Sequence, residues 1–248
     1  MKIILASQSP RRIALLDLAK IDFEVLPSGY DEKIDKSMSI EEISKELAYG
    51  KAKDVFDNTQ GDRTIIGADT IVVKDNVIFG KPKDRAEAIK MLKEIQGDVH
   101  TVYTSLAILI EERGEYKEYK EVVETDITVN PMTDAEIIEY IDQEEPYDKA
   151  GGYGIQGIFS KFISSINGDY YNVMGLPIFK VRQALKKYDF SLKRYCIICK
   201  NEVPEDEEFC PNCGNKIKSK FENQVCPTCH KMNSPNNKYC INCGRKGS

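Results

Sequence analysis

Residues 2–12 read Lys-Ile-Ile-Leu-Ala-Ser-Gln-Ser-Pro-Arg-Arg, and this stretch sets out the basic unit of the fold. The apolar run 2–6 predicts a short buried strand. Ser9 and Pro10 follow as a helix N-cap and a proline at the first helical position. Apolar residues that recur further along predict a helix over residues 10–19. A strand, a tight turn and a helix N-terminus in this order form a ready phosphate-binding site.

The arginine pair Arg11 and Arg12 falls in the first turn of this expected helix. That turn is the positive end of the helix dipole, where acidic side chains are usually favoured. An anion bound by the helix N-terminus and the two guanidinium groups would explain the pair. The alternative is an ordinary capped helix with two solvated arginines, and this segment alone fits both interpretations.

Strand and helix signals alternate along the first 188 residues, a pattern typical of the α/β class. Two capping boxes, Ser39 with Glu42 and Thr133 with Glu136, predict the starts of two helices. The pattern is compatible with a parallel sheet and with a mixed one. The expected strands lie at residues 2–6, 64–73, 102–110, 121–129 and about 161–166, and the expected helices begin near residues 10, 40, 85, 134 and 176.

All eight cysteines follow residue 195, in four Cys-x-x-Cys pairs that form a repeated unit. Two such pairs supply the four thiolates of a closed, tetrahedral zinc site, which is structural rather than catalytic. Disulfides are the alternative, and a cytoplasmic chain disfavours them. We therefore expect two structural Zn²⁺ ions, bound by Cys196, Cys199, Cys210, Cys213, Cys226, Cys229, Cys240 and Cys243. The spacing does not assign the pairs to particular ions.

These patterns divide the chain into parts of opposite charge. The first domain covers residues 1–188, a linker covers 189–195, and 196–248 resemble a double zinc ribbon, with ribbons at 196–213 and 226–243. The formal net charge of −5 combines an acidic first domain with a basic tail. A basic segment can bind a protein or nucleic acid, or it can simply be a solvated surface.

The N-terminus lacks the features of a signal peptide, and no apolar run approaches the length of a membrane span. We therefore expect a soluble, cytoplasmic protein without a membrane partner.

Several polar residues stand in places that favour chemistry. Asp69 interrupts an apolar strand, so its carboxylate should be paired, hydrogen-bonded or bound to a metal. Lys51 shares the inward helix face of Leu47 and Val55, and it either snorkels to solvent or enters a cleft. Lys81 lies in a turn, and Gln156 in the glycine-rich segment 149–157 could read a nucleobase edge.

Four motifs together resemble the Maf family of nucleoside triphosphate pyrophosphatases over residues 1 to about 188. They are Leu5-Ala-Ser-Gln-Ser-Pro-Arg-Arg12, Gly67-Ala-Asp-Thr70, Gly80-Lys-Pro82 and Lys149-Ala-Gly-Gly-Tyr-Gly-Ile-Gln-Gly157. The resemblance implies a mixed α/β fold shared with inosine triphosphatase-like enzymes, with a cleft between two lobes. It also implies hydrolysis of a nucleoside triphosphate to the monophosphate and pyrophosphate.

The resemblance further implies roles for individual residues. Asp69 would activate water, and Glu32 would be its companion in binding a divalent metal, Mg²⁺ or Mn²⁺. The residues expected to hold the triphosphate are Ser7, Arg11, Arg12, Lys51 and Lys81. Arg12, Thr70 and Gln156 match positions linked to base selection in the branch that acts on dTTP and UTP.

The alternative function is a nucleotide-sensing regulator of septum formation and cell division that acts through its zinc ribbons. A nucleic-acid-binding protein is less favoured, because the basic tail lacks an aromatic-rich face. As partners we expect a nucleoside triphosphate in the cleft, a protein or nucleic acid at the ribbons, and a second copy of the chain in a homodimer.

Overall fold

The structure is a computed structural model in which the chain forms two units, residues 1–190 and 191–248. It describes residues 2–32, 35, 37–143, 146–188, 194–196, 198–199, 201–203, 207–216, 224–225 and 232–233. None of the helices within these ranges is long and apolar enough to cross a membrane.

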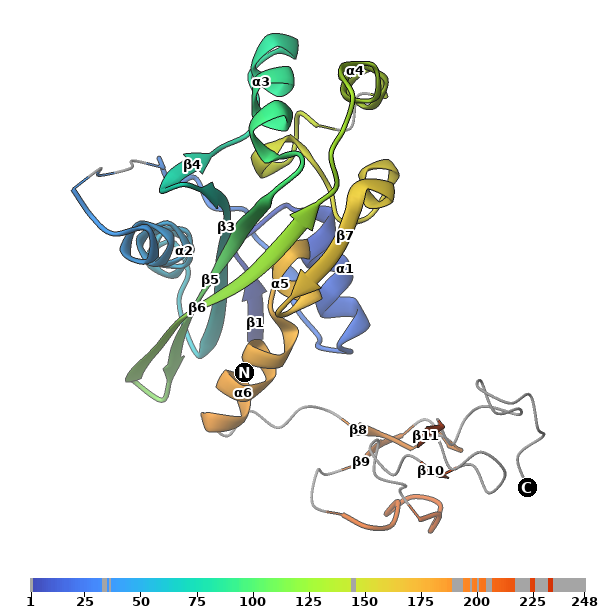
Figure 1. Cartoon of the computed structure of the whole chain (residues 1–248). Coiled ribbons are helices and arrows are strands. Elements are labelled where there is room, and N and C mark those ends of the chain that lie inside the picture. Colours follow the sequence, from blue (N-terminus) through green and yellow to red (C-terminus); the bar gives the residue numbers. More distant parts are fainter. Residues whose placement is uncertain are drawn as a thin grey trace. The chain divides into compact units, whose positions relative to one another are not determined.

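The first unit is built on a seven-stranded sheet with strand order β2-β1-β3-β5-β6-β7, and β4 pairs with β3 (Figure 1). The strands are β1 (Lys2–Leu5), β2 (Glu24–Val25), β3 (Arg63–Lys74), β4 (Val77–Phe79), β5 (Val99–Glu112), β6 (Glu115–Val129) and β7 (Ile163–Asn167). β1 runs parallel to β2 and β3, whereas the other pairs are antiparallel. The sheet is therefore mixed, as the family resemblance implied.

Six α-helices and two 3-10 turns complete the described part of this unit. They are α1 (Pro10–Leu18), α2 (Ile40–Asp57), α3 (Arg85–Ile95), α4 (Asp134–Ile141), η1 (Ala150–Gly152), η2 (Ile158–Phe162), α5 (Tyr170–Met174) and α6 (Ile178–Lys187). The capping boxes predicted at the starts of α2 and α4 are both present. The sequence patterns missed β2, β4 and α5, because segments of two to five residues are too short to show a period.

Helix α2 packs closely against one face of the sheet, while α1, α5 and α6 lie on the other side (Figure 1). Ala48 and Ala52 of α2 form a core cluster with Ile65 of β3. The approach is close at Gly67, where a Cβ atom would lie 2.5 Å from the Ala48 carbonyl oxygen. Glycine at this position therefore lets the helix backbone rest directly on β3.

One edge of β3 is partly uncovered. β5 pairs along almost all of one side of β3. On the opposite side, β1 pairs with residues 63–66 and β4 with residues 72–74. Residues 67–71 have no strand partner on that side within the described part of the chain. Because side chains alternate along a strand, Asp69 faces α2 whereas Thr70 faces α1 and α5.

In the described residues of the second unit, two small hairpins are present. β8 (Arg194–Tyr195) pairs with β9 (Glu202–Val203), and β10 (Gln224–Val225) pairs with β11 (Met232–Asn233). β8 covers the last two residues of the segment predicted as a linker. Regular structure in the second unit therefore begins before the first cysteine, because β8 and β9 pair on either side of the first Cys-x-x-Cys turn.

Candidate active site

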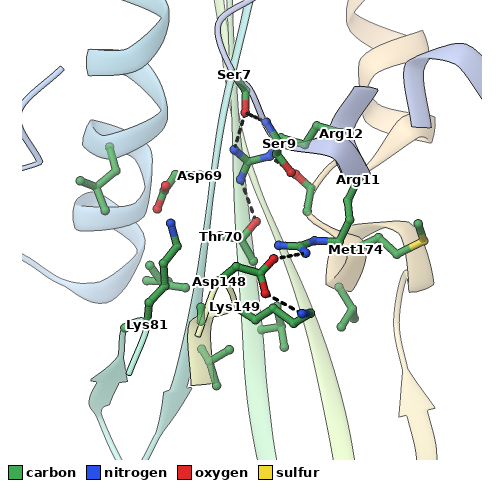
Figure 2. Close-up of a pocket in the computed structure, with 18 of the residues that line it drawn as sticks. Ser7, Ser9, Arg11, Arg12, Asp69, Thr70, Lys81, Asp148, Lys149 and Met174 are labelled. Atoms are coloured by element: carbon green, nitrogen blue, oxygen red, sulfur yellow. Dashed lines mark hydrogen bonds and ion pairs between the residues drawn. The ribbon is translucent and has the colours of Figure 1, made fainter. Parts of the chain in front are cut away.

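A cavity of about 890 Å³ lies at the uncovered edge of β3. Figure 2 shows side chains from the loop after β1, from α1, from β3 and from the glycine-rich segment converging on it. All nine site residues predicted for the first domain line this cavity: Ser7, Arg11, Arg12, Glu32, Lys51, Asp69, Thr70, Lys81 and Gln156. These nine residues are spread over more than 140 positions of the sequence, from Ser7 to Gln156, and the fold brings them together.

On the α2 side of the β3 edge, Lys51 joins two carboxylates. Its ammonium group forms an ion pair with Asp69 and lies 2.7 Å from Glu32 Oε1. The side chain of Asp69 is 10% exposed and that of Lys51 is 15% exposed, whereas Glu32 is about half exposed. Lys51 therefore occupies the inward helix face that its spacing predicted, and the isolated carboxylate of Asp69 has the partner that its burial required.

On the opposite side of the same edge, Arg12 is held by three hydrogen bonds. Its Nε donates to the Gly175 carbonyl oxygen at 2.8 Å, and its Nη1 and Nη2 donate to Ser7 Oγ and Thr70 Oγ1, each at 3.2 Å (Figure 2). Burial lowers the pKa of Arg12, and the nearby Asp69 opposes that shift. A guanidinium group nevertheless stays charged in proteins, so a fixed cation faces the cavity.

The predicted N-cap of α1 is Ser9, but its side chain makes no capping hydrogen bond. Its backbone N–H donates instead to Ser7 Oγ at 3.2 Å. Ser7 Oγ thus accepts both from this turn and from Arg12, which ties the loop after β1 to the helix that follows.

Sequence analysis missed two charged residues of the cavity, Asp148 and Lys149. Arg11 Nη1 donates to Asp148 Oδ2 at 2.9 Å, and Lys149 Nζ donates to Asp148 Oδ1 at 2.6 Å (Figure 2). Asp148 thus neutralises two cations at the mouth of the cavity. The available signal was their position at the start of the glycine-rich segment, with Asp148 directly before it and Lys149 as its first residue.

The glycine-rich segment is anchored at two points. Gly151 N–H donates to the Gly80 carbonyl oxygen at 3.0 Å, next to Lys81. His100 Nε2 lies 2.6 Å from Tyr153 Oη. Burial lowers the pKa of His100 to about 4, so its ring is neutral near pH 7. These contacts keep Lys81 and Gln156 at the cavity, and in Figure 2 Lys81 extends towards Asp69.

The first cysteine quartet of the second unit is arranged for a metal ion. The sulfur atoms of Cys196, Cys199, Cys210 and Cys213 all lie within 4.8 Å of one another. Two of the distances, Cys196 to Cys213 and Cys199 to Cys210, are 3.6 and 3.5 Å. Zn–S bonds of about 2.3 Å in a tetrahedron need sulfur separations of about 3.8 Å, so this quartet fits zinc.

The two turns of this quartet repeat one local design. The backbone N–H of the first cysteine donates to the carbonyl oxygen five residues later, at 2.8 Å in both turns. Asn215 Nδ2 also donates to Cys213 Sγ at 3.5 Å, the kind of support that orients a metal ligand. The four cysteines of the second predicted quartet, Cys226, Cys229, Cys240 and Cys243, lie outside the described residues.

We expect the purified chain to contain two zinc ions, and Cys210→Ser to lose one of them. A zinc site loses most of its affinity when one of four thiolates is removed, because the serine hydroxyl is a poor ligand. Elemental analysis of both proteins, with thiol titration, measures this. Zinc-free protein whose mass shows four disulfides would contradict the expectation.

A cavity with several fixed cations at one strand edge, together with two carboxylates bridged by a lysine, defines an α/β protein built to bind a polyanion and act on it. The comparisons with known proteins narrow this class. The Maf-like protein family model matches residues 2–188, and the double zinc ribbon model matches residues 196–244. The chain belongs to the Maf family.

Individual relatives are similar to this chain over about the length of its first unit. The dTTP/UTP pyrophosphatase of Alkaliphilus oremlandii is 49% identical over 190 residues, which are 75% of this chain and 96% of that protein. The dTTP/UTP pyrophosphatase of Caldicellulosiruptor bescii is 41% identical over 196 residues, or 78% of this chain and 98% of that protein. Among solved structures, a dITP/XTP pyrophosphatase from Mycobacterium abscessus matches with a TM-score of 0.36 and 13% identity, covering 76% of this chain and 96% of that one.

These findings bear on the two functions that the sequence suggested. The family match and the relatives support the first of these, a nucleotide pyrophosphatase. None of them supports the alternative, a regulator of septum formation.

Proposed function

We propose that this chain hydrolyses dTTP and UTP to the nucleoside monophosphate and pyrophosphate. One observation carries the proposal: the cavity joins a lysine-bridged carboxylate pair on one side of the β3 edge to a fixed arginine and threonine on the other. The first arrangement suits hydrolysis of a phosphate anhydride, and the second suits recognition of a base. Two relatives at 41–49% identity carry the name dTTP/UTP pyrophosphatase.

In this proposal, Asp69 is the general base of the reaction. It takes a proton from the water molecule whose oxygen forms a new bond to the α-phosphorus. The bond between the α-phosphorus and the bridging oxygen then breaks, and pyrophosphate leaves with that oxygen. Lys51 orients Asp69 through their ion pair, while Lys51 and Lys81 offset the charge that builds up on the phosphates.

The carboxylates of Asp69 and Glu32 are the ligands for a divalent cation in this proposal. Mg²⁺ is commonly bound by one or two carboxylates together with substrate phosphates, so this donor pair, with one member half exposed, fits Mg²⁺ or Mn²⁺. Such an ion supplies charge neutralisation and lowers the pKa of bound water.

The remaining residues of the cavity have binding roles in this proposal. Ser7 and Arg11, at the N-terminus of α1, contact the phosphates together with that helix's free N–H groups. A triphosphate then competes with Asp148 for Arg11, since the two are paired in the free protein. Arg12, Thr70 and Gln156 contact the base.

A screen of nucleoside triphosphates tests the proposal by measuring monophosphate, pyrophosphate and kcat/KM for each base. We expect dTTP and UTP to give the highest kcat/KM values, with a divalent metal required. A clear preference for GTP, ITP or 7-methyl-GTP would contradict the pyrimidine assignment. Release of inorganic phosphate in place of pyrophosphate would contradict the reaction itself.

The ribbons, in this proposal, are a docking module for a protein or nucleic acid, and the enzyme acts in the cytoplasm as a homodimer. A chain that ends at Tyr188 should therefore fold and hydrolyse dTTP at a rate similar to the full chain. Every residue that lines the cavity belongs to the first unit. Tyr188 is kept because its hydroxyl donates to the Glu118 carbonyl oxygen at 2.9 Å.

The measurement is kcat/KM for the truncated and intact chains, with circular dichroism to verify folding. A folded, soluble truncated chain without activity would show that the ribbons belong to the active unit.

A further inference from the structure

Thr104 lies directly beneath the cavity residue Thr70. The two face each other across the β3–β5 pair, and their hydroxyl oxygens are 2.9 Å apart. Thr104 is fully buried and does not line the cavity. Its hydroxyl also lies 2.7 Å from the Asn172 carbonyl oxygen, to which it donates. Thr104 therefore links a cavity residue to the helix on that face of the sheet.

These contacts fix the direction of each hydroxyl proton. A carbonyl oxygen can only accept, so the single proton of Thr104 points to Asn172. Thr104 must then accept from Thr70, whose own proton is directed into the protein. Thr70 Oγ1 also accepts from Arg12 Nη2. What Thr70 still offers to the cavity is an acceptor lone pair and no proton.

The Asn172 carbonyl oxygen is a firmly placed acceptor. It also accepts from Gly175 N–H at 2.9 Å. The Asn172 side chain is fully buried, and its Nδ2 donates to the Val102 carbonyl oxygen at 3.0 Å and to Thr125 Oγ1 at 2.9 Å. The series of hydrogen bonds from Thr70 through Thr104 to Asn172 is thus held in place by two strands, β5 and β6.

We propose that Thr104 is a positioning residue for base specificity: it holds the Thr70 hydroxyl as an acceptor and so favours a base with a ring N–H. Uracil and thymine present a ring N–H between two carbonyl oxygens. Cytosine presents a ring acceptor beside an amino donor. In the described residues Arg12 uses three of its five donors and keeps one N–H on each Nη for a base carbonyl. Acceptor and donors together therefore complement uracil and thymine, whereas cytosine lacks the ring N–H that the Thr70 acceptor needs.

This inference rests on the proposed function, and it adds a mechanism by which the site distinguishes uracil and thymine from cytosine. The test compares Thr104→Val with Thr104→Ser by the ratio of kcat/KM for UTP to that for CTP. Valine keeps the shape but frees the Thr70 proton to turn towards the cavity. We expect the ratio to fall about three- to tenfold, the effect of one hydrogen bond. Serine keeps the hydroxyl, so its ratio should equal that of the unmodified chain.

A purely structural role for Thr104 would lower kcat/KM for both nucleotides equally, and an unchanged ratio in Thr104→Val would overturn the inference. A second measurement needs no variant: UTP methylated at the ring N–H should be a much poorer substrate of the unmodified chain than UTP. Equal turnover of the two would also overturn it. If the unmodified chain hydrolyses neither dTTP nor UTP, the proposed function itself fails, and this inference fails with it.

Discussion

Replacing Asp69 by asparagine should leave the fold intact and lower kcat for dTTP by about 10²–10⁴-fold, the usual effect of losing a general base. Asparagine has nearly the same shape, so the packing of β3 against α2 is preserved. Its amide cannot take the proton from the attacking water. The loss will be larger if the divalent cation also needs this carboxylate.

The measurement is pyrophosphate release under substrate saturation, with thermal unfolding to verify the fold. A suitable control is Asp75→Asn, in the exposed turn between β3 and β4. Asp75 has a φ of 50°, a left-handed conformation that asparagine also tolerates. The control should keep full activity. A folded Asp69→Asn protein with near-normal turnover would remove Asp69 from the mechanism.

Replacing Lys51 by methionine should lower kcat/KM by about 10²–10³-fold, the usual effect of removing one preorganised charge-stabilising group. Methionine keeps the length and apolar stem of the side chain, so α2 should still pack on the sheet. Asp69 and Glu32 would lose the cation that lies between them. Their two negative charges would then repel the triphosphate, and Asp69 would lose the contact that orients it.

Lys45 provides the matched control on the same helix. It is 40% exposed and lies 4.0 Å from Glu41, one helical turn away. Lys45→Met should therefore behave like the unmodified chain in the same assay. If Lys51→Met is folded and equally active, the ion pairs of Lys51 are structural only, and the assigned role in catalysis is wrong.

Much of the cavity was predictable because its residues violate local rules. Asp69 is a charge in an apolar strand, Lys51 is a charge on an inward helix face, and two arginines occupy the wrong end of a helix dipole. Each exception signals a partner that lies elsewhere in the chain. The capping boxes were equally readable, because both members of each box lie within four residues.

The unpredicted features depend on contacts between distant residues. Asp148 joins Arg11 across 137 positions, and nothing near Asp148 reveals this. Thr104 lies in a segment, 100–104, to which the family resemblance extends, but no role was predicted for it, since threonine favours strands for steric reasons alone. The grouping of the first four cysteines into one cluster needed the spatial positions of the sulfur atoms, because successive Cys-x-x-Cys pairs are separated by similar lengths of chain.

The uncovered edge of β3 has a kinetic consequence. In the proposed mechanism Asp69 activates the water and Thr70 contacts the base. The two are successive residues, so their spacing is set by one strand, with a rise of about 3.3 Å per residue, rather than by loops. A nucleotide whose base sits poorly against Thr70 will shift its α-phosphate relative to Asp69. Misplacement of reacting atoms by about 1 Å can slow a reaction about 100-fold. Discrimination between bases should therefore appear in kcat as well as in KM. An incorrect nucleotide can then bind to the enzyme and still be hydrolysed only slowly.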